Sequence, residues 1–135
     1  MKTTMRVGRA LLLSGALLAS ACATPYGPAS ESLKGGYSDY MLQNDRFNVS
    51  FVGNAYISEE QAIDYLLYRC AEITRKHGFD YFVVVAEEGI ATAKGALTKR
   101  LRVTIELRKG QRPADNPDAY GAQELMRNLQ AKIER

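Results

Sequence analysis

The sequence has few of the residues from which metal sites and nucleophilic catalytic sites are built. It contains one histidine, His77, and two cysteines, Cys22 and Cys70, among 135 residues. A zinc site commonly takes about four Cys or His ligands, and a Cys–His nucleophile pair needs a histidine beside the thiol. His77 falls in the last turn of an expected helix, where a basic side chain complements the helix dipole. We therefore expect no metal, no cofactor and no catalytic residues, and interpret His77 as a helix-terminal residue.

The body of the chain also lacks an excess of positive charge. Three of the 18 basic residues and none of the 15 acidic residues lie in 1–21, so 22–135 carries 15 of each sign. Phosphate backbones are bound by clustered Lys and Arg, which makes a basic surface the first requirement for a nucleic-acid-binding protein. The sequence thus predicts no nucleic-acid partner, despite a pI of about 8.9.

The N-terminal hydrophobic run is too short to span a membrane as a helix. Residues 10–19 are ten uncharged residues, whereas a transmembrane helix needs about 20. A basic segment, 1–9, precedes this run, and small residues lead from it to Cys22. This order is typical of a secretory signal peptide.

Residues 1–22 resemble the signal and lipobox of bacterial lipoproteins. The resemblance rests on the basic start, the short apolar run and the sequence Leu-Ala-Ser-Ala-Cys that ends at Cys22. It departs from the family at Ala19, where Leu is most frequent. In that family the cysteine thiol is alkylated by a diacylglycerol group, and the signal is cut just before the cysteine. The new N-terminus is then acylated, for example with palmitate. The resemblance implies a lipoprotein signal peptide over 1–21 and lipid attachment at Cys22; the alternative is an ordinary secretory signal cut nearby.

The same resemblance implies a location. One acyl chain binds a membrane only marginally, whereas two or more anchor a protein stably, so a triacylated Cys22 implies a permanent anchor with membrane lipid as its partner. In the Gram-negative members, Asp after the cysteine tends to retain the protein in the inner membrane, and this chain has Ala23 there. The expected location is the bacterial cell envelope, at the outer membrane, on the periplasmic side.

Residues 22–44 are expected to form the lipidated cysteine and a flexible tether. Pro, Gly, Ser and Ala dominate the fourteen residues 23–36, and no helix or strand period appears; this composition is typical of linkers. Fully extended, the segment would reach roughly 45 Å. Tyr26, Tyr37 and Tyr40 interrupt it, and we expect Tyr37 and Tyr40 to pack against the folded part.

Three strands are predicted in the core domain, 45–109. Residues 46–52 and 101–108 alternate apolar and polar side chains, which favours strands with one wet face. Residues 79–86 are almost continuously apolar, which favours a strand covered on both faces. The segment 89–98, rich in Ala and Gly, is expected to be a long hairpin loop.

Two helices are predicted. Ser58 and Gln61 form a capping box at the start of a helix over 59–77, whose apolar residues recur at spacings of three and four. Residues 110–135 are expected to form a linker and a C-terminal amphipathic helix that starts at Asn116. The order β-α-β-β-α predicts a single α+β domain.

The predicted sheet is three-stranded and mixed, and a helix packs on it. A right-handed crossover makes the first two strands parallel and the third antiparallel to both. One arrangement places the third strand between the others, whereas the apolar run 79–86 favours a central second strand. The open edges of such a sheet can recruit another strand. We therefore expect an envelope protein partner or a homodimer formed through a sheet edge.

Two neighbouring residues of the long helix stand out. With Cys22 lipidated, Cys70 has no disulfide partner, and in an oxidising periplasm we expect it to be buried. Arg69 lies mid-helix beside the apolar stripe and is able to reach Asp39, Asp45 or another acid, which would fix the end of the tether to the helix. The alternative is an Arg whose charged end reaches solvent.

The remaining charged groups have structural interpretations. Adjacent carboxylates point to different sides of a helix or strand, so the pairs Glu59-Glu60 and Glu87-Glu88 are not expected to converge on a substrate. Basic residues gather on and after the third strand, where they form a solvated face or attract anionic lipid headgroups. They are Arg100, Arg102, Arg108 and Lys109.

The body of the chain resembles a family of small bacterial envelope lipoproteins that has no assigned activity. The resemblance spans about 26–107 and rests on residues 36–39 (Gly-Tyr-Ser-Asp), 51–54 (Phe-Val-Gly-Asn), 65–71 with Arg69, and Gly78. It implies a lipid-anchored envelope protein and supplies no ligand or catalytic residue.

Two functions are compatible with this sequence. The first is a non-catalytic binding or structural module that faces the periplasm, which an exposed sheet edge or an aromatic patch around Tyr37, Tyr40 and Tyr56 would favour. The second is a small periplasmic hydrolase that uses carboxylates brought together by the fold, which a deep acidic pocket would favour.

Overall fold

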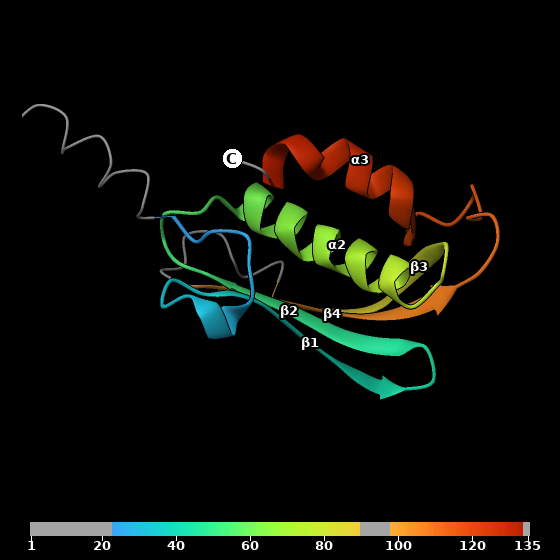
Figure 1. Cartoon of the computed structure of the whole chain (residues 1–135), viewed down its shortest axis with the longest axis horizontal. Coiled ribbons are helices and arrows are strands. Elements are labelled where there is room, and N and C mark those ends of the chain that lie inside the picture. The colour runs from blue at the N-terminus through green and yellow to red at the C-terminus, as the bar shows by residue number, and fades with distance from the viewer. Residues whose placement is uncertain (1–22, 90–97, 134–135) are drawn as a thin grey trace, which may run out of the picture.

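Two helices lie on one face of a five-stranded sheet, so the fold is α+β as predicted (Figure 1). The computed structural model describes residues 23–89 and 98–133; the predicted signal peptide and Cys22 lie outside the described residues, as does most of the predicted 89–98 loop. The elements are η1 (Ala29–Glu31), β1 (Gly36–Gln43), β2 (Arg46–Gly53), α2 (Glu59–Lys76), β3 (Tyr81–Glu88), β4 (Lys99–Arg108), β5 (Ala119–Gly121) and α3 (Ala122–Ile133).

The strand order is β1-β2-β4-β3-β5, and each neighbouring pair is antiparallel. β4 lies between β2 and β3, which run parallel to each other without pairing. This confirms the arrangement in which the third predicted strand separates the other two. The predicted three-stranded mixed sheet is wrong, because β1 and β5 add an edge strand on each side and the sheet is antiparallel throughout.

β1 corrects the prediction of a flexible tether over 22–44. It pairs with β2 from Gly36 opposite Val52 to Gln43 opposite Arg46, and the two strands form a hairpin. Most β1 side chains are exposed or half-buried, because β1 is an edge strand with α2 covering only part of one face. An edge strand of this kind shows no apolar alternation, so its residues resemble a linker in sequence.

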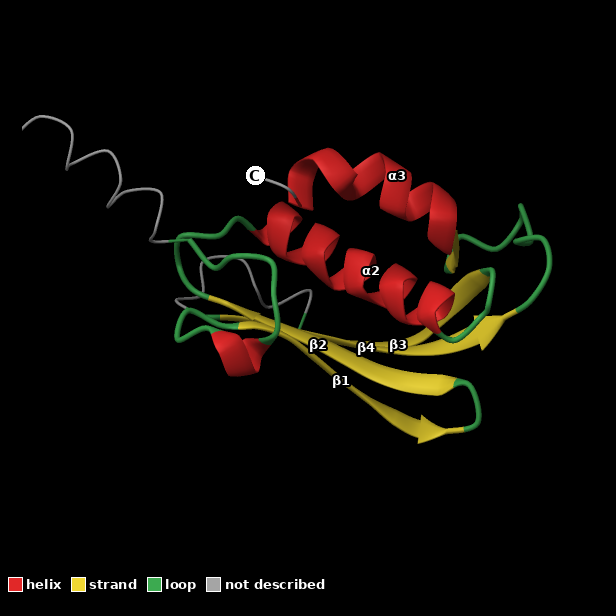
Figure 2. Cartoon of the chain, in the orientation of Figure 1, coloured by secondary structure: helices red, strands yellow, loops and turns green. Residues whose placement is uncertain are grey.

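β3 is covered on one face only, which corrects the prediction for 79–86. Phe82 and Val84 are buried under the helices, whereas Val85 is 45% exposed. Both helices lie on the same side of the sheet (Figure 2), so the opposite side of β3 faces solvent. The register shifts between Val84 and Ala86 where β3 pairs with β4, which marks a bulge at the exposed Val85.

The predicted helix 59–77 is confirmed as α2, with half of the predicted capping box. Ser58 Oγ accepts a hydrogen bond of 3.1 Å from the Gln61 backbone N–H, but the Gln61 side chain donates forward to Tyr65 Oη at 2.9 Å. His77 ends the helix, and Gly78 follows at a φ of 80°, a left-handed conformation that glycine adopts without steric cost.

The C-terminal helix begins later than predicted. Asn116 Oδ1 accepts a hydrogen bond from the Asp118 N–H at 2.9 Å, so this segment forms a turn rather than a helix start. β5 then pairs with β3, and α3 begins only at Ala122. Lys132 contacts Asp64 of α2 at 3.0 Å, which ties the end of α3 to the longer helix.

The core lies between the sheet and α2. Most of its residues come from β2, β3, β4 and α2, with alternate strand residues pointing toward the helix as period-2 strands require. The most deeply buried include Val49, Phe51, Leu66, Cys70, Phe82, Leu101 and Ile105.

Candidate functional site

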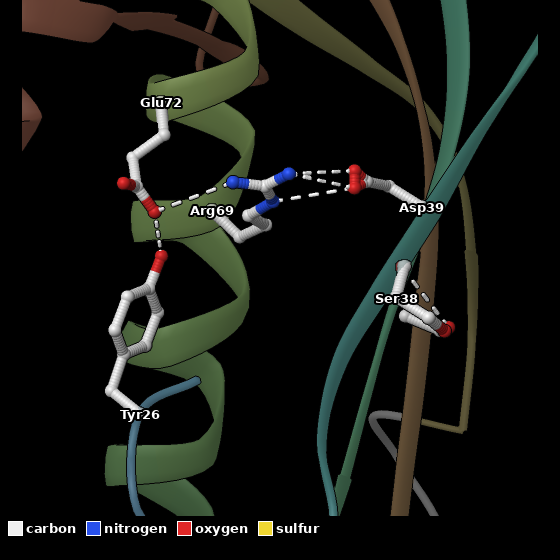
Figure 3. Close-up of polar contacts among 6 residues, drawn as sticks. Tyr26, Ser38, Asp39, Arg69 and Glu72 are labelled. Carbon is white, nitrogen blue, oxygen red and sulfur yellow. Dashed lines mark hydrogen bonds and ion pairs between the residues drawn. The ribbon is translucent and has the colours of Figure 1, made fainter. Parts of the chain in front are cut away.

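A group of polar and aromatic contacts lies where the N-terminal segment and β1 meet α2. Tyr26 precedes η1, Asp39 lies on β1, and Arg69 and Glu72 lie on α2 (Figure 3). Tyr37 also lies on β1. We call these five residues the junction cluster. Tyr37 and Asp39 are two positions apart on a strand, so both point to the face that α2 covers.

Arg69 joins β1 to α2. Its Nη2 donates to both carboxylate oxygens of Asp39 at 2.9 Å, and its Nε lies 3.3 Å from Oδ2. The guanidinium carbon also lies 4.3 Å from the centre of the Tyr37 ring, within the range of a cation–π interaction. The predicted contact between Arg69 and Asp39 is confirmed, and the alternative of a solvent-reaching Arg is wrong, because its side chain is only 18% exposed.

Glu72 is the second carboxylate beside Arg69. Its Oε1 lies 3.8 Å from Arg69 Nη1 and accepts a hydrogen bond from the Tyr26 hydroxyl. Burial raises the pKa of Glu72 above the usual range of a glutamate, because desolvation disfavours the charged form. Asp39 and Glu72 are therefore two carboxylates assembled by the fold, and both are engaged by one cation.

Tyr26 fixes the segment after Ala23 to α2. Its ring centre lies 5.1 Å from that of Tyr37, 5.4 Å from Tyr65 and 5.3 Å from Tyr68, distances typical of favourable aromatic pairs. The backbone continues the attachment, since the Tyr37 N–H donates to Gly27 O at 2.9 Å. This segment was predicted to be part of the tether and instead packs against the domain.

Thr24 forms a second attachment at the same end of the molecule. Its side chain is almost fully buried, with 2% of the residue exposed. Thr24 Oγ1 donates to Lys34 O at 2.7 Å and accepts from the Asn54 N–H at 2.8 Å. A single hydroxyl thus joins the loop before β1 to the loop after β2. This role of Thr24 was not predicted, because a threonine in a Pro- and Gly-rich stretch carries no signal of burial.

These contacts give Gly53 and Asn54 a structural role that the sequence left open. A Cβ on Gly53 would lie 2.6 Å from Ile57 Cγ2, so only glycine allows the chain to pass this close to Ile57 without a shift. Asn54 Oδ1 then accepts from the Tyr56 N–H at 3.1 Å, a side-chain turn that shapes the loop into α2.

Cys70 is a buried free cysteine, as predicted. Burial raises the pKa of its thiol far above the ordinary value, with a smaller contribution from Asp39, while Arg69 acts in the opposite direction. Since the thiolate is the nucleophile, the burial and the raised pKa both disfavour reaction of this thiol in the folded protein.

The other candidate residues make separate contacts and do not come together in one site. His77 packs against the Phe47 ring with 4.9 Å between ring centres. Of the glutamate pairs, Glu60 lies 3.8 Å from Lys132 and Glu88 lies 3.6 Å from Arg102.

The basic patch is interrupted by acids. Arg102 faces Glu88, and Arg108 lies 2.5 Å from Glu106. Lys109 sits over the Phe79 ring at 5.5 Å. Opposite charges therefore alternate across much of this face rather than forming one basic surface.

Residues 23–89 and 98–133 contain no group of three or more His, Cys, Asp or Glu side chains suited to a metal ion. None of the helices in the described part of the chain has the length and hydrophobicity to cross a membrane. No family model, curated protein or solved structure matches the chain.

Proposed function

We propose that the protein is a lipid-anchored component of the bacterial cell envelope, held by a triacylated Cys22 after removal of residues 1–21. The observation that carries this proposal is the order of features in the first 22 residues: a basic start, ten uncharged residues, small residues and then Cys22. The absence of Asp at position 23 supports sorting to the outer membrane, with the domain on the periplasmic side.

The attachment of Thr24 and Tyr26 to the domain changes the geometry of the proposed anchor. A tether of fourteen residues would let the domain stand roughly 45 Å from the bilayer. Thr24 and Tyr26 are instead attached to the domain, so only Ala23 separates the anchor cysteine from a fixed residue. Two residues span about 7 Å at most. The lipid would therefore hold the folded domain directly against the membrane surface.

We further propose that the domain works by non-catalytic binding or as a structural module. The feature that supports binding is the edge strand β1, on which Tyr40 is 57% exposed, Met41 55% and Leu42 47%. Neither proline nor lysine occurs in β1, and these are residues that commonly protect an edge from pairing. A strand of an envelope protein or of a second copy of this chain would extend the sheet at β1.

Membrane fractionation of two alanine variants tests the anchor. We expect Cys22→Ala to release the protein from the membrane fraction of a Gram-negative host, because the acceptor thiol is lost. Cys70→Ala is the matched control: it removes the other cysteine from a buried site, and the protein should stay with the membrane. Membrane retention of Cys22→Ala, or equal release of both variants, would overturn the proposal.

A further inference from the structure

We infer that the end of the domain around Thr24 rests on the lipid bilayer, with the side chains of Leu33 and Tyr56 inserted into its interfacial region. This inference rests on the proposed lipid attachment at Cys22 and adds an orientation: one end of the sheet, rather than its open face, meets the membrane.

Thr24 is hydrogen-bonded to both of the loops that carry Leu33 and Tyr56. Leu33 adjoins Lys34, whose carbonyl accepts the hydrogen bond from the Thr24 hydroxyl. Tyr56 is bonded through its N–H to the side chain of Asn54, whose own N–H donates to Thr24. The loops that carry Leu33 and Tyr56 lie at one end of the sheet, and the β1–β2 turn lies at the other (Figure 1).

These two residues are the most exposed large apolar side chains of the described chain. The exposed fraction is 109% for Leu33 and 72% for Tyr56. Exposed apolar residues scattered singly are ordinary. These two, however, lie on the two loops that are hydrogen-bonded to Thr24, which is two positions after the anchor cysteine. Leucine favours the hydrocarbon side of a membrane interface, and tyrosine favours the headgroup level.

The short chain between the anchor and the domain favours a bilayer as the occupant. Lys34, next to Leu33, is exposed and is able to meet lipid phosphates, and the exposed Glu31 balances its charge. With about 7 Å of chain between the anchor and Thr24, the local concentration of lipid at these loops is very high. Weak contacts that would not hold a free domain on a membrane then become effective.

Single-tryptophan variants of the full lipidated chain test this inference, because the natural sequence contains no tryptophan. The probes are Leu33→Trp and Tyr56→Trp. The matched controls are Leu42→Trp and Tyr40→Trp, which change the same residue types at exposed sites, roughly 20 and 13 Å along β1 from Gly36. Each variant is purified, and its circular dichroism spectrum is compared with that of the wild type. The variant is then reconstituted into phosphatidylethanolamine–phosphatidylglycerol vesicles with or without brominated acyl chains.

We expect brominated lipid to quench roughly half of the emission of Trp at positions 33 and 56, because interfacial side chains reach about 5–10 Å into the headgroup and acyl boundary. Emission at the control positions should be unchanged. The inference is overturned if the probe and control positions respond alike. It is equally overturned if probe emission shifts to the blue without quenching, since the loops would then contact protein, such as a second copy.

The intact mass of each variant distinguishes failure of the inferred orientation from failure of the proposed lipid anchor. If the purified variants carry the acyl mass and float with the vesicles, absence of quenching contradicts the orientation alone. If they carry no acyl group, the proposed anchor fails and the orientation fails with it.

Discussion

Asp39 of β1 accepts hydrogen bonds of 2.9 Å from Arg69 of α2 through both of its carboxylate oxygens. The pair connects residues 30 positions apart and fixes the edge strand to the helix that covers the sheet. The Tyr26 hydroxyl donates to Glu72 of the same helix. The start of the described chain is therefore fixed to the same helix as β1.

Arg69→Ala should lower the free energy of unfolding by about 1–3 kcal/mol, because it leaves Asp39 without a partner at a site where both side chains are less than one-fifth exposed. Urea denaturation measures the change. Arg75→Ala is the matched control, since its contact with Asp80 is 3.7 Å and its side chain is 47% exposed; its cost should stay within about 0.5 kcal/mol. Equal costs for the two variants would contradict a stabilising role for the Asp39 contact.

Tyr26→Ala should destabilise the protein by about 2 kcal/mol, since it removes a ring packed among three tyrosines together with the hydroxyl bond to Glu72. Tyr26→Phe retains the ring and should cost about 1 kcal/mol. Hydrogen exchange should show faster exchange of the Tyr37 amide in the alanine variant, because its acceptor is Gly27 O. Tyr56→Ala, at an exposed site, is the control; if it matches Tyr26→Ala, the docked segment contributes nothing.

Glu72 gives the stability a specific pH dependence. Burial raises the pKa of its carboxyl above the ordinary value of about 4.3, so the folded protein binds this proton more tightly than the unfolded chain. Ionisation of Glu72 therefore lowers the free energy of unfolding as pH rises through the window between the two pKa values. The stability of Glu72→Gln relative to wild type should rise over that window and level off above it. A difference that does not vary from about pH 4 to about pH 7 would contradict this assignment.

The sequence predicted the parts of the fold that bury apolar surface on a regular period. The alternation at Phe47, Val49 and Phe51 identified β2, and the cap at Ser58 identified the start of α2. The edge strands β1 and β5 were not predicted, because they bury little apolar surface on a regular period. β1 is mostly exposed, and β5 is three residues long, so neither carries a period long enough to recognise.

The candidate site was predicted in part. Arg69 stood out as a charge beside an apolar stripe, and Asp39 was one of its expected partners. The aromatic residues Tyr26 and Tyr37 were the available signal that the segment before β1 packs on the domain. Thr24 gave no such signal, because its burial depends on two loops that meet only in the folded chain.

Cys70 should react with a thiol reagent only when the protein unfolds, because burial holds its pKa far above neutrality and blocks access. In the lipidated protein Cys22 has no free thiol, so the membrane-purified chain should show no labelling in buffer and one label in urea. Rapid labelling in buffer would mean either that Cys22 is unmodified or that Cys70 is accessible. Peptide mapping of the labelled residue distinguishes the two.

The intact mass of the protein extracted from membranes tests the lipid anchor most directly. We predict a chain that begins at Cys22 and carries the added mass of a diacylglyceryl group and one further acyl chain. A chain that begins at another residue, or that begins at Cys22 with no added mass, would contradict the anchor and with it the placement of the domain on the membrane.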